Sequence, residues 1–384
     1  MILTLTPNPS LDRTVSLPGP LQRGTVQRLT GVVMEPGGKG VNVARVLSNS
    51  GRAATAVLPA AEHDPILAAL GALELPGLTV HPVLVTGAAR INTAVTEPDG
   101  TTTKLNELGA GLSEQEIAAV EHALLETLAT TPLPVGASPH HWAVLSGSLP
   151  PGIPTNWYAR LVGLLREAAP GLRIAVDTSD EPLAALAAEL PDSAPDLIKP
   201  NGEELGQLAG LPADRAMALE EGAVEGNYDP VVDAARLLVG LGIGAVMVTL
   251  GPAGAVLVTA DGAWHATAPE VPVVSTVGAG DSSVAGYILA DVNGGDEAER
   301  LSTAMAYGSA AASLPGTTLP TPADLPEHPS VVTRLSCAGA PGGTRNAVLP
   351  HSPAPHTSPA ACRSARPPRP STPTTHHMTA AHHP

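Results

Sequence analysis

The chain has 384 residues, of which 43% are hydrophobic and 15% are charged, and its formal net charge is -16 at pH 7. This length and hydrophobic content suffice for one large α/β domain or two ordinary ones. The excess of acidic residues argues against nucleic acid as a partner, because proteins that bind nucleic acids present basic surfaces to the phosphates.

Membrane insertion and a disulfide framework are also unexpected. No apolar run approaches the roughly 20 residues that a helix needs to span a bilayer. The first six residues predict a strand and lack the basic start and cleavage site of a signal peptide. Both cysteines, Cys337 and Cys362, lie near the C-terminus, so we expect no disulfide and no cysteine-bound metal in the core. These features predict a cytoplasmic protein.

The N-terminal third predicts strands separated by glycine- and proline-rich turns. A buried strand at 2–6 runs into a proline-rich turn, and the residues from 15 to 33 alternate as short exposed strands do. A glycine-rich segment then leads into a helix over 41–47, which is followed by a strand over 53–58. The segment 90–106 turns at Pro98-Asp-Gly100 and predicts a hairpin.

From about residue 113, helices and strands alternate regularly. Helices are expected at 114–129, 154–169, 181–190, from 203, and at 231–241; strands are expected at 142–146, 172–177, 197–198, 245–250 and 254–259. This alternation predicts a mostly parallel sheet with helices on both faces and right-handed crossovers. The hairpin-like pieces within about 10–35 and 88–106 do not fit it and predict a small accessory β-layer.

Two segments lack a regular period. The acidic stretch 213–229 predicts a surface insertion. The C-terminal residues are rich in Pro, Ser, Thr and His and predict a disordered tail. We therefore divide the chain into a domain at 1–329 and a tail at 330–384.

The segment Gly278-Ala279-Gly280-Asp281 predicts an anion site. It follows an apolar, strand-like run at 271–274 and opens a helical pattern. A glycine-bracketed turn at a helix N-terminus directs unpaired N–H groups and the positive end of the helix dipole at one point. A carboxylate there suits a hydroxyl group that is about to lose its proton. The same residues also fit an ordinary helix start with Asp281 in the first turn.

A second glycine-rich turn, Gly37-Gly38-Lys39-Gly40, also precedes a helix, which carries Asn42. It lacks the spacing of a Walker A motif, but its backbone N–H groups, Lys39 and Asn42 could approach a ligand. The alternative is a glycine-rich helix entry. The chain has only three lysines, Lys39, Lys104 and Lys199, and two of them lie in such turns, where a compact ammonium charge has a use.

Three further motifs follow strands. Asn201 and Glu204 begin a helix and could hold Mg²⁺ through water, although the same pair fits a capping box. The segment Thr249-Leu-Gly251-Pro-Ala-Gly254 breaks a strand at the carboxyl edge of the sheet, where ligands bind in open α/β folds, or forms an ordinary hairpin turn. Ser148 follows another strand and could present its hydroxyl to a sugar, or lie in a simple connector.

Taken together and in this order, the motifs resemble those of the PfkB (ribokinase-like) carbohydrate kinases over residues 1 to about 325. Within that family, Thr4-Leu-Thr-Pro-Asn-Pro-Ser-Leu-Asp12, Arg90-Ile-Asn92 and Ser275-Thr-Val277 resemble the bacterial 1-phosphofructokinase and tagatose-6-phosphate kinase branch, and the first of these more closely. Kinases of uncharged sugars need no such arginine, so Arg90 favours a phosphorylated substrate.

The resemblance implies a ribokinase-like three-layer α/β/α fold with a small β-sheet lid, ATP and Mg²⁺, small-molecule substrates and a homodimer formed through the lid. It implies that Asp281 is the general base and that the amides of Gly278, Ala279 and Gly280 form the anion hole. Asn201 and Glu204 would organise Mg²⁺ and the phosphates. The ATP side would be lined by Lys199, Thr249, Gly251 and Gly254. The sugar phosphate would be held by Asp12, Gly38, Lys39, Asn42, Arg90 and Ser148, and we add Lys104 as a further candidate.

The expected reaction is the ATP-dependent phosphorylation of D-fructose 1-phosphate at its 6-hydroxyl, which gives fructose 1,6-bisphosphate. Two alternatives stay open at this point. The chain could act on tagatose 6-phosphate or fructose 6-phosphate, with the ketose reversed in the site. It could also be a non-catalytic sugar-phosphate sensor on the same fold, because fold does not imply activity.

Overall fold

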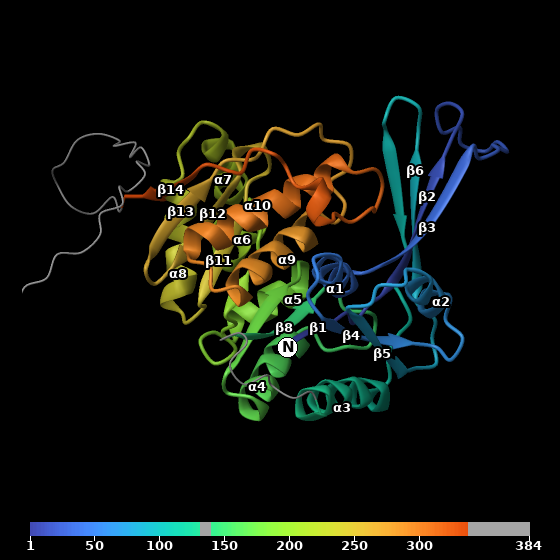
Figure 1. Cartoon of the computed structure of the whole chain (residues 1–384), viewed down its shortest axis with the longest axis horizontal. Coiled ribbons are helices and arrows are strands. Elements are labelled where there is room, and N and C mark those ends of the chain that lie inside the picture. The colour runs from blue at the N-terminus through green and yellow to red at the C-terminus, as the bar shows by residue number, and fades with distance from the viewer. Residues whose placement is uncertain (131–139, 337–384) are drawn as a thin grey trace, which may run out of the picture. The chain divides into compact units, whose positions relative to one another are not determined.

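The computed structural model describes residues 1–130 and 140–336. The chain divides into units at 1–338 and 339–384, and the described residues all lie in the first. Their strands form a ten-stranded sheet and a separate four-stranded sheet, which projects away from the layered body in Figure 1. Among the described residues, no helix has both the length and the apolar character needed to cross a bilayer.

The large sheet is parallel over most of its width. Its strand order is β14-β13-β12-β11-β10-β9-β8-β1-β4-β5, and every neighbouring pair from β11 to β5 is parallel, whereas β12, β13 and β14 are antiparallel. The strands are β1 (Ile2–Leu5), β4 (Ala54–Ala60), β5 (Leu78–Leu84), β8 (His141–Ser146), β9 (Leu172–Asp177), β10 (Leu197–Ile198), β11 (Ala245–Thr249), β12 (Ala255–Thr259), β13 (Gly262–Ala266) and β14 (Val332–Leu335). The predicted mostly parallel sheet is confirmed.

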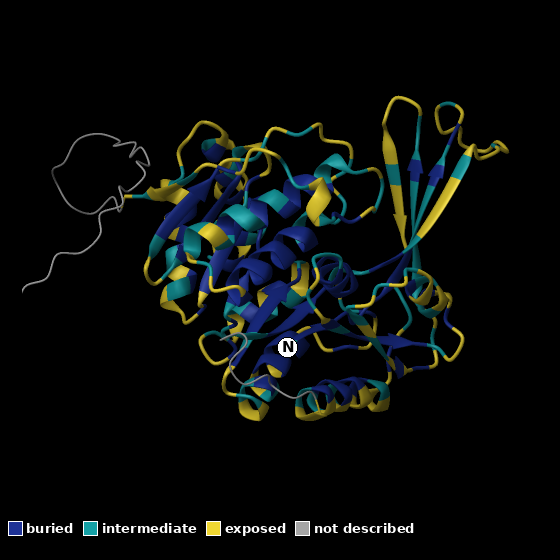
Figure 2. Ribbon diagram, viewed as in Figure 1, coloured by how far each residue is buried: buried dark blue, intermediate teal, exposed yellow. Residues whose placement is uncertain are grey.

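Alternating side chains give the sheet two apolar faces, and helices cover both. Leu3 and Leu5 of β1 face one core cluster, whereas Ile2 faces the other, as the two-residue period of a strand requires. The first face is covered by α3 (Glu114–Thr130), α4 (Trp157–Ala168), α5 (Asp180–Ala188), α6 (Gly202–Leu208), α7 (Ala213–Val224) and α8 (Asp229–Gly240). The second is covered by α1 (Lys39–Asn49), α2 (Pro65–Ala72), α9 (Ala279–Val292) and α10 (Glu297–Ser313). Figure 2 shows the buried layer between them, and the three-layer expectation is confirmed.

The small sheet, which we call the lid, has the strand order β3-β2-β6-β7. Its strands are β2 (Ser10–Ser16), β3 (Gly31–Gly37), β6 (Arg90–Thr96) and β7 (Thr102–Asn106). The register pairs Asp12 with Asn92, and Asn92 with Asn106, so these three polar residues share one face. The expected accessory β-layer is therefore present, close to the predicted segments.

Three segments differ from the sequence expectations. Residues 213–229 are not an irregular insertion, because they contain α7, which buries Leu219 and Ala223 against the core. The apolar run 271–274 forms no strand: Pro272 cannot donate to a ladder, and the Val274 amide donates to Ala312 O instead. The first unit continues past the expected boundary at 329, because β14 joins the sheet beside β13. The rest of the predicted tail and both cysteines lie outside the described residues.

Candidate active site at the carboxyl edge of the sheet

The carboxyl ends of four adjacent strands bring most of the predicted residues to one edge. Ser148 follows β8, Asp177 ends β9, Lys199 follows β10, and Thr249 ends β11. Two glycine-bracketed helix starts, those of α1 and α9, reach the same edge, as the charge contacts below show. In open α/β sheets this edge is where ligands bind.

Asp281 lies in the first turn of α9 and is only 7% exposed. Gly278 precedes the helix with φ of 78°, a left-handed conformation that favours glycine. No side chain caps this helix among the described residues, and Gly278, Ala279 and Gly280 remain partly exposed. A helix start without a cap leaves N–H groups for a ligand, and the helix dipole favours an anion there.

The carboxylate of Asp281 accepts a hydrogen bond from Asn42 of α1, with 2.8 Å between Nδ2 and Oδ2. Burial raises the pKa of Asp281 to about 6, and the nearby carboxylate of Asp177 acts in the same direction. Lys39, Lys199 and the Asn42 hydrogen bond oppose this rise because they stabilise the ionised form. The result is a carboxyl group that titrates close to neutral pH.

Asp177 binds two of the three lysines, and the sequence analysis did not select it. Its Oδ1 lies 3.0 Å from Lys39 Nζ and 3.6 Å from Lys199 Nζ. Burial by itself would raise the pKa of Asp177, but these two lysines outweigh that effect and hold the pKa below its usual value. Burial also disfavours the charged form of Lys39, but Asp177 and Asp281 raise its pKa. The available signal in the sequence was a carboxylate at the end of the strand predicted at 172–177.

Asn201 and Glu204 do form the capping box. The Glu204 amide donates to Asn201 Oδ1 at 2.7 Å, and the Asn201 amide donates to Glu204 Oε2 at 2.9 Å. Each side chain keeps acceptor capacity, because Glu204 Oε1 and a second lone pair on Asn201 Oδ1 are not used by the cap. The capping box and the ligand-binding interpretation are therefore compatible.

The described residues contain no cluster of three or more His, Cys, Asp or Glu side chains that could hold a metal ion. Mg²⁺ in phosphoryl-transfer sites keeps several waters and takes one or two carboxylates together with the substrate phosphates. The oxygen donors of Asn201 and Glu204 fit a Mg²⁺ ion that is held in this way.

The end of β11 lies beside the capping box. Thr249 forms a parallel bridge with Asn201, and its amide donates to Pro200 O at 3.0 Å. The 3₁₀ turn η1 (Gly251–Ala253) follows, and Gly254 closes it by accepting from the Leu250 amide at 2.9 Å. These contacts place Thr249 beside the start of α6, and Gly251 and Gly254 belong to the turn that follows β11.

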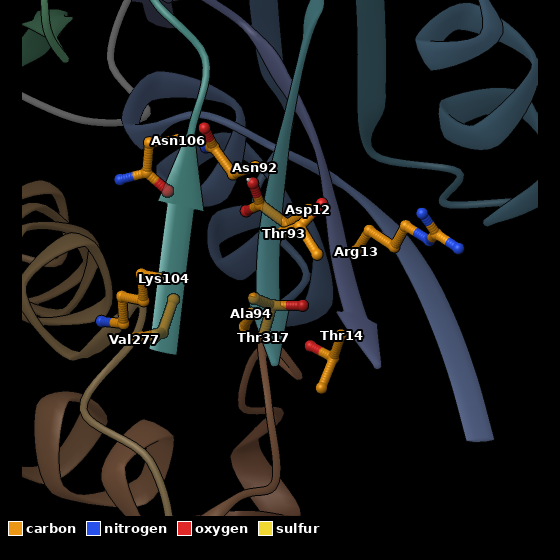
Figure 3. Close-up of a pocket in the computed structure, with 10 residues that line it drawn as sticks. All are labelled: Asp12, Arg13, Thr14, Asn92, Thr93, Ala94, Lys104, Asn106, Val277 and Thr317. Atoms are coloured by element: carbon orange, nitrogen blue, oxygen red, sulfur yellow. Dashed lines mark hydrogen bonds between the residues drawn. The ribbon is translucent and has the colours of Figure 1, made fainter. Parts of the chain in front are cut away.

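A pocket of about 150 Å³ lies between the lid and the body, and Figure 3 shows its lining. The lining residues are Asp12, Arg13, Thr14, Asn92, Thr93, Ala94, Lys104, Asn106, Val277 and Thr317. Asp12 is held by Ser10 Oγ at 2.8 Å and by Asn92 Nδ2 at 3.0 Å. It lies so close to β3 that a Cβ on Gly37 would be 2.1 Å from its Oδ2. Of the predicted sugar-binding residues, Asp12 and Lys104 line this pocket.

The other predicted sugar-binding residues are not part of this lining. Arg90 donates to Glu107 O at 3.2 Å, and burial lowers the pKa of its guanidinium although Asp12 opposes this effect. Ser148 Oγ accepts from Asn8 Nδ2 at 3.3 Å. Gly38 precedes α1. On that helix, the Lys39 side chain contacts Asp177 and the Asn42 side chain contacts Asp281. Val277 joins the two groups, because it lines the pocket and directly precedes Gly278.

This arrangement can bind two anionic substrates and move one proton. A buried carboxyl group that titrates near neutrality meets a helix N-terminus that can hold a phosphoryl group. Two ammonium groups lie beside them, and a polar pocket roofed by the lid opens next to the helix start. Positioning and charge neutralisation of this kind are the main requirements of phosphoryl transfer.

Comparison with known proteins agrees with this geometry. The model of the pfkB family of carbohydrate kinases matches residues 8–324. The chain is 37% identical over 313 residues to the 1-phosphofructokinase of Rhodobacter capsulatus, covering 80% of this chain and 90% of that protein. It is 34% identical over 322 residues to the ATP-dependent 6-phosphofructokinase isozyme 2 of Escherichia coli, covering 83% and 94%. A crystal structure of Escherichia coli phosphofructokinase-2 with substrates and products matches with a TM-score of 0.71 and 32% identity, covering 84% and 96%. The chain belongs to the pfkB family of carbohydrate kinases.

Proposed function

We propose that this kinase transfers the γ-phosphoryl group of ATP to the 6-hydroxyl of D-fructose 1-phosphate, giving fructose 1,6-bisphosphate and ADP. The observation that carries this proposal is the buried carboxyl of Asp281 at the uncapped start of α9, with Lys39 and Lys199 beside it. The similarity to 1-phosphofructokinases at 34–37% identity favours the 1-phosphate as substrate. ATP use and the absence of cysteine before residue 337 fit a cytoplasmic enzyme.

In the proposed mechanism, Asp281 accepts the proton of the sugar hydroxyl as its oxygen attacks the γ-phosphorus. The new O–P bond forms while the bond from the γ-phosphorus to the β,γ-bridging oxygen breaks, and ADP leaves with that oxygen. The amides of Gly278, Ala279 and Gly280 stabilise the charge on the transferred group. Mg²⁺ held at Asn201 and Glu204 through water would neutralise charge on the phosphates.

The lid pocket is the proposed site of the sugar phosphate. Asp12 can accept hydrogen bonds from sugar hydroxyls, because its carboxylate is already fixed by Ser10 and Asn92. Lys104 lines the pocket and supplies a positive charge for the phosphate, and Arg90 lies on the neighbouring strand, four residues before the Ala94 that pairs with Lys104. Closure of the lid over this pocket would exclude water, so that ATP is not hydrolysed.

A second candidate is the phosphorylation of fructose 6-phosphate. It is favoured by the similarity to the ATP-dependent 6-phosphofructokinase isozyme 2 of Escherichia coli, which covers as much of the chain. This reaction would use the same base and nucleotide site, with the other end of the ketose facing Asp281.

The test is ADP release by the purified full chain with Mg²⁺-ATP and each of fructose 1-phosphate, fructose 6-phosphate and tagatose 6-phosphate. We expect kcat/KM to favour fructose 1-phosphate by about 100-fold, or about 2.7 kcal/mol of transition-state stabilisation. A preference for a 6-phosphate would mean that the sugar binds in the opposite orientation, with its other end facing Asp281. Binding without ADP release would favour the sensor.

Asp281→Asn should fold normally and lose about 10²–10⁴-fold in kcat.

The proposal includes a homodimer formed through the outer face of the lid. The face opposite Asp12 carries Val15 and Val95, which are buried, together with Val32, Met34 and Leu105, which are 50–59% exposed. These apolar side chains share the outer face with Arg13 and Thr93, and they give the lid an exposed apolar surface that a second copy would bury.

The mass of the protein in solution, measured by light scattering after gel filtration, tests this interface. Wild type should have twice the mass of the chain, and Met34→Glu with Leu105→Glu should give monomers. Thr102→Glu, an exposed change on the inner face of β7, is the matched control and should stay dimeric. A monomeric wild type, or a double variant that remains dimeric, would exclude this interface.

A further inference from the structure

The contact between Asn42 and Asp281 joins the two glycine-bracketed helices of the site. Asn42 lies one turn into α1 and is buried, and Asp281 lies in the first turn of α9. The distance of 2.8 Å from Nδ2 to Oδ2 is that of a charge-assisted hydrogen bond. The amide of Asn42 therefore points at the base and not into the lid pocket, whose lining does not include it.

The chemistry of this contact distinguishes the two carboxylate oxygens. The amide nitrogen of Asn42 can only donate, so Oδ2 must be the acceptor. A proton on Oδ2 would weaken that hydrogen bond, because a protonated carboxyl oxygen is a poorer acceptor than an ionised one. Among the described residues no donor binds Oδ1, so Oδ1 is the oxygen that remains available to a substrate hydroxyl.

Charged groups from three other places face Asp281. Lys39 comes from the start of α1, Asp177 from the end of β9, and Lys199 from the segment after β10. Lys39 and Lys199 are both bound to Asp177. They act on the carboxyl through space, whereas Asn42 provides its direct hydrogen bond.

We propose that Asn42 is a positioning residue for the general base: it holds Oδ2 of Asp281 so that Oδ1 receives the proton of the sugar hydroxyl. This inference rests on the proposed function and gives Asn42 a role other than the sugar contact expected from the sequence.

The experiment compares Asn42→Leu, which keeps the approximate shape but removes the donor, with Asn49→Leu. Asn49 lies on the same helix, and its amide donates to Pro320 O at 3.3 Å, away from the base. We expect Asn42→Leu to lower kcat by about 10–100-fold, since it loses a hydrogen bond to a charged group. The acid limb of the pH–kcat profile should move up by about one pH unit, and the KM of the sugar phosphate should stay within about threefold. Asn49→Leu should match wild type.

Three further measurements keep the inference falsifiable. If Asn42→Leu does not fold, as judged by circular dichroism, Asn42→Ala replaces it. Asn42→Asp should move the acid limb further than Asn42→Leu, because it places a second carboxylate beside the base. Titration of the Asp281 carboxyl by ¹³C NMR, assigned with Asp281→Asn, measures the same shift without turnover, so it decides the inference even if fructose 1-phosphate is not the substrate.

Two outcomes would overturn the inference. If Asn42→Leu raises the KM of the sugar phosphate and leaves kcat intact, Asn42 is a substrate contact. If kcat falls but neither the acid limb nor the NMR titration moves, Asn42 only supports the fold. A different result would overturn the proposed function alone. In that case the wild type phosphorylates none of the three sugars, but the NMR titration of Asp281 still differs between wild type and Asn42→Leu.

Discussion

At the scale of single residues, the site depends on how a few charges share a buried space. Asp281 is buried in α9, which disfavours its ionised form, while Lys39 and Lys199 favour it. Asp177 counteracts both lysines because it binds each of them. The balance leaves the pKa of Asp281 at about 6, where a carboxylate is both ionised at neutral pH and basic enough to accept a proton.

This balance predicts the pH dependence of the reaction. Because the proposed mechanism requires Asp281 in its ionised form, kcat/KM should be constant above neutrality and should fall about tenfold per pH unit below about 6. Initial rates of ADP release between pH 5 and 8 measure it. The second ionisation of a phosphate ester also lies near 6, so the residual rate of Asp281→Asn is the control. If that variant keeps the same acid limb, the limb belongs to the substrate.

At the scale of elements, α7 fixes the start of α6. Its Glu220 accepts from the Gly202 amide at 2.9 Å, next to the capping box of Asn201 and Glu204. A Cβ on Gly202 would lie 2.5 Å from Glu220 Cγ, so the two helices meet closely here. The stretch expected as an insertion thus supports the proposed Mg²⁺ and ATP side of the site.

We expect Glu220→Ala to raise the KM of Mg²⁺-ATP by about 3–10-fold, because the first turn of α6 loses the hydrogen bond that fixes it. The KM of the sugar phosphate should not change. Glu221→Ala is the matched control, since Glu221 is the exposed neighbour on the same helix and carries the same charge. Steady-state kinetics with each substrate varied in turn would test this. A lower Tm with an unchanged KM would show that Glu220 only supports stability.

At the scale of the whole molecule, the two edges of the sheet have different roles. The carboxyl edge holds the candidate site. At the amino edge, Asp291 near the end of α9 binds side chains from neighbouring elements. Its fully buried carboxylate accepts from Trp142 Nε1 at 2.9 Å and from Arg173 Nη1 at 2.6 Å, it forms an ion pair with Arg300, and its Oδ2 lies 3.0 Å from His140 Nδ1. One carboxylate therefore ties together α9, α10 and the starts of β8 and β9.

Asp291→Ala should destabilise the protein by about 3–5 kcal/mol, because it leaves the arginines and the indole N–H without their buried acceptor. Denaturation by urea measures this change. The kcat of the folded fraction should equal that of wild type, since the site lies at the opposite edge. Asp233→Asn, whose side chain is 78% exposed, is the control and should change stability by less than about 0.5 kcal/mol. A matching loss of kcat in folded Asp291→Ala would contradict this separation.

The sequence by itself determined the layers, most element positions and the motifs of the site. Those features depend on local period and on glycine and proline positions, so the helix start at Gly278 and the strands of the lid were predictable. Only the tertiary structure decided which side chains meet. Asp177 contacts Lys39 across 138 positions, and Asn42 contacts Asp281 across 239. The stretch containing α7 shows little helical periodicity in its sequence. Its position is set by close packing against α6, which no local pattern indicates. Contacts of this kind depend on how strands order within the sheet, which no local pattern specifies.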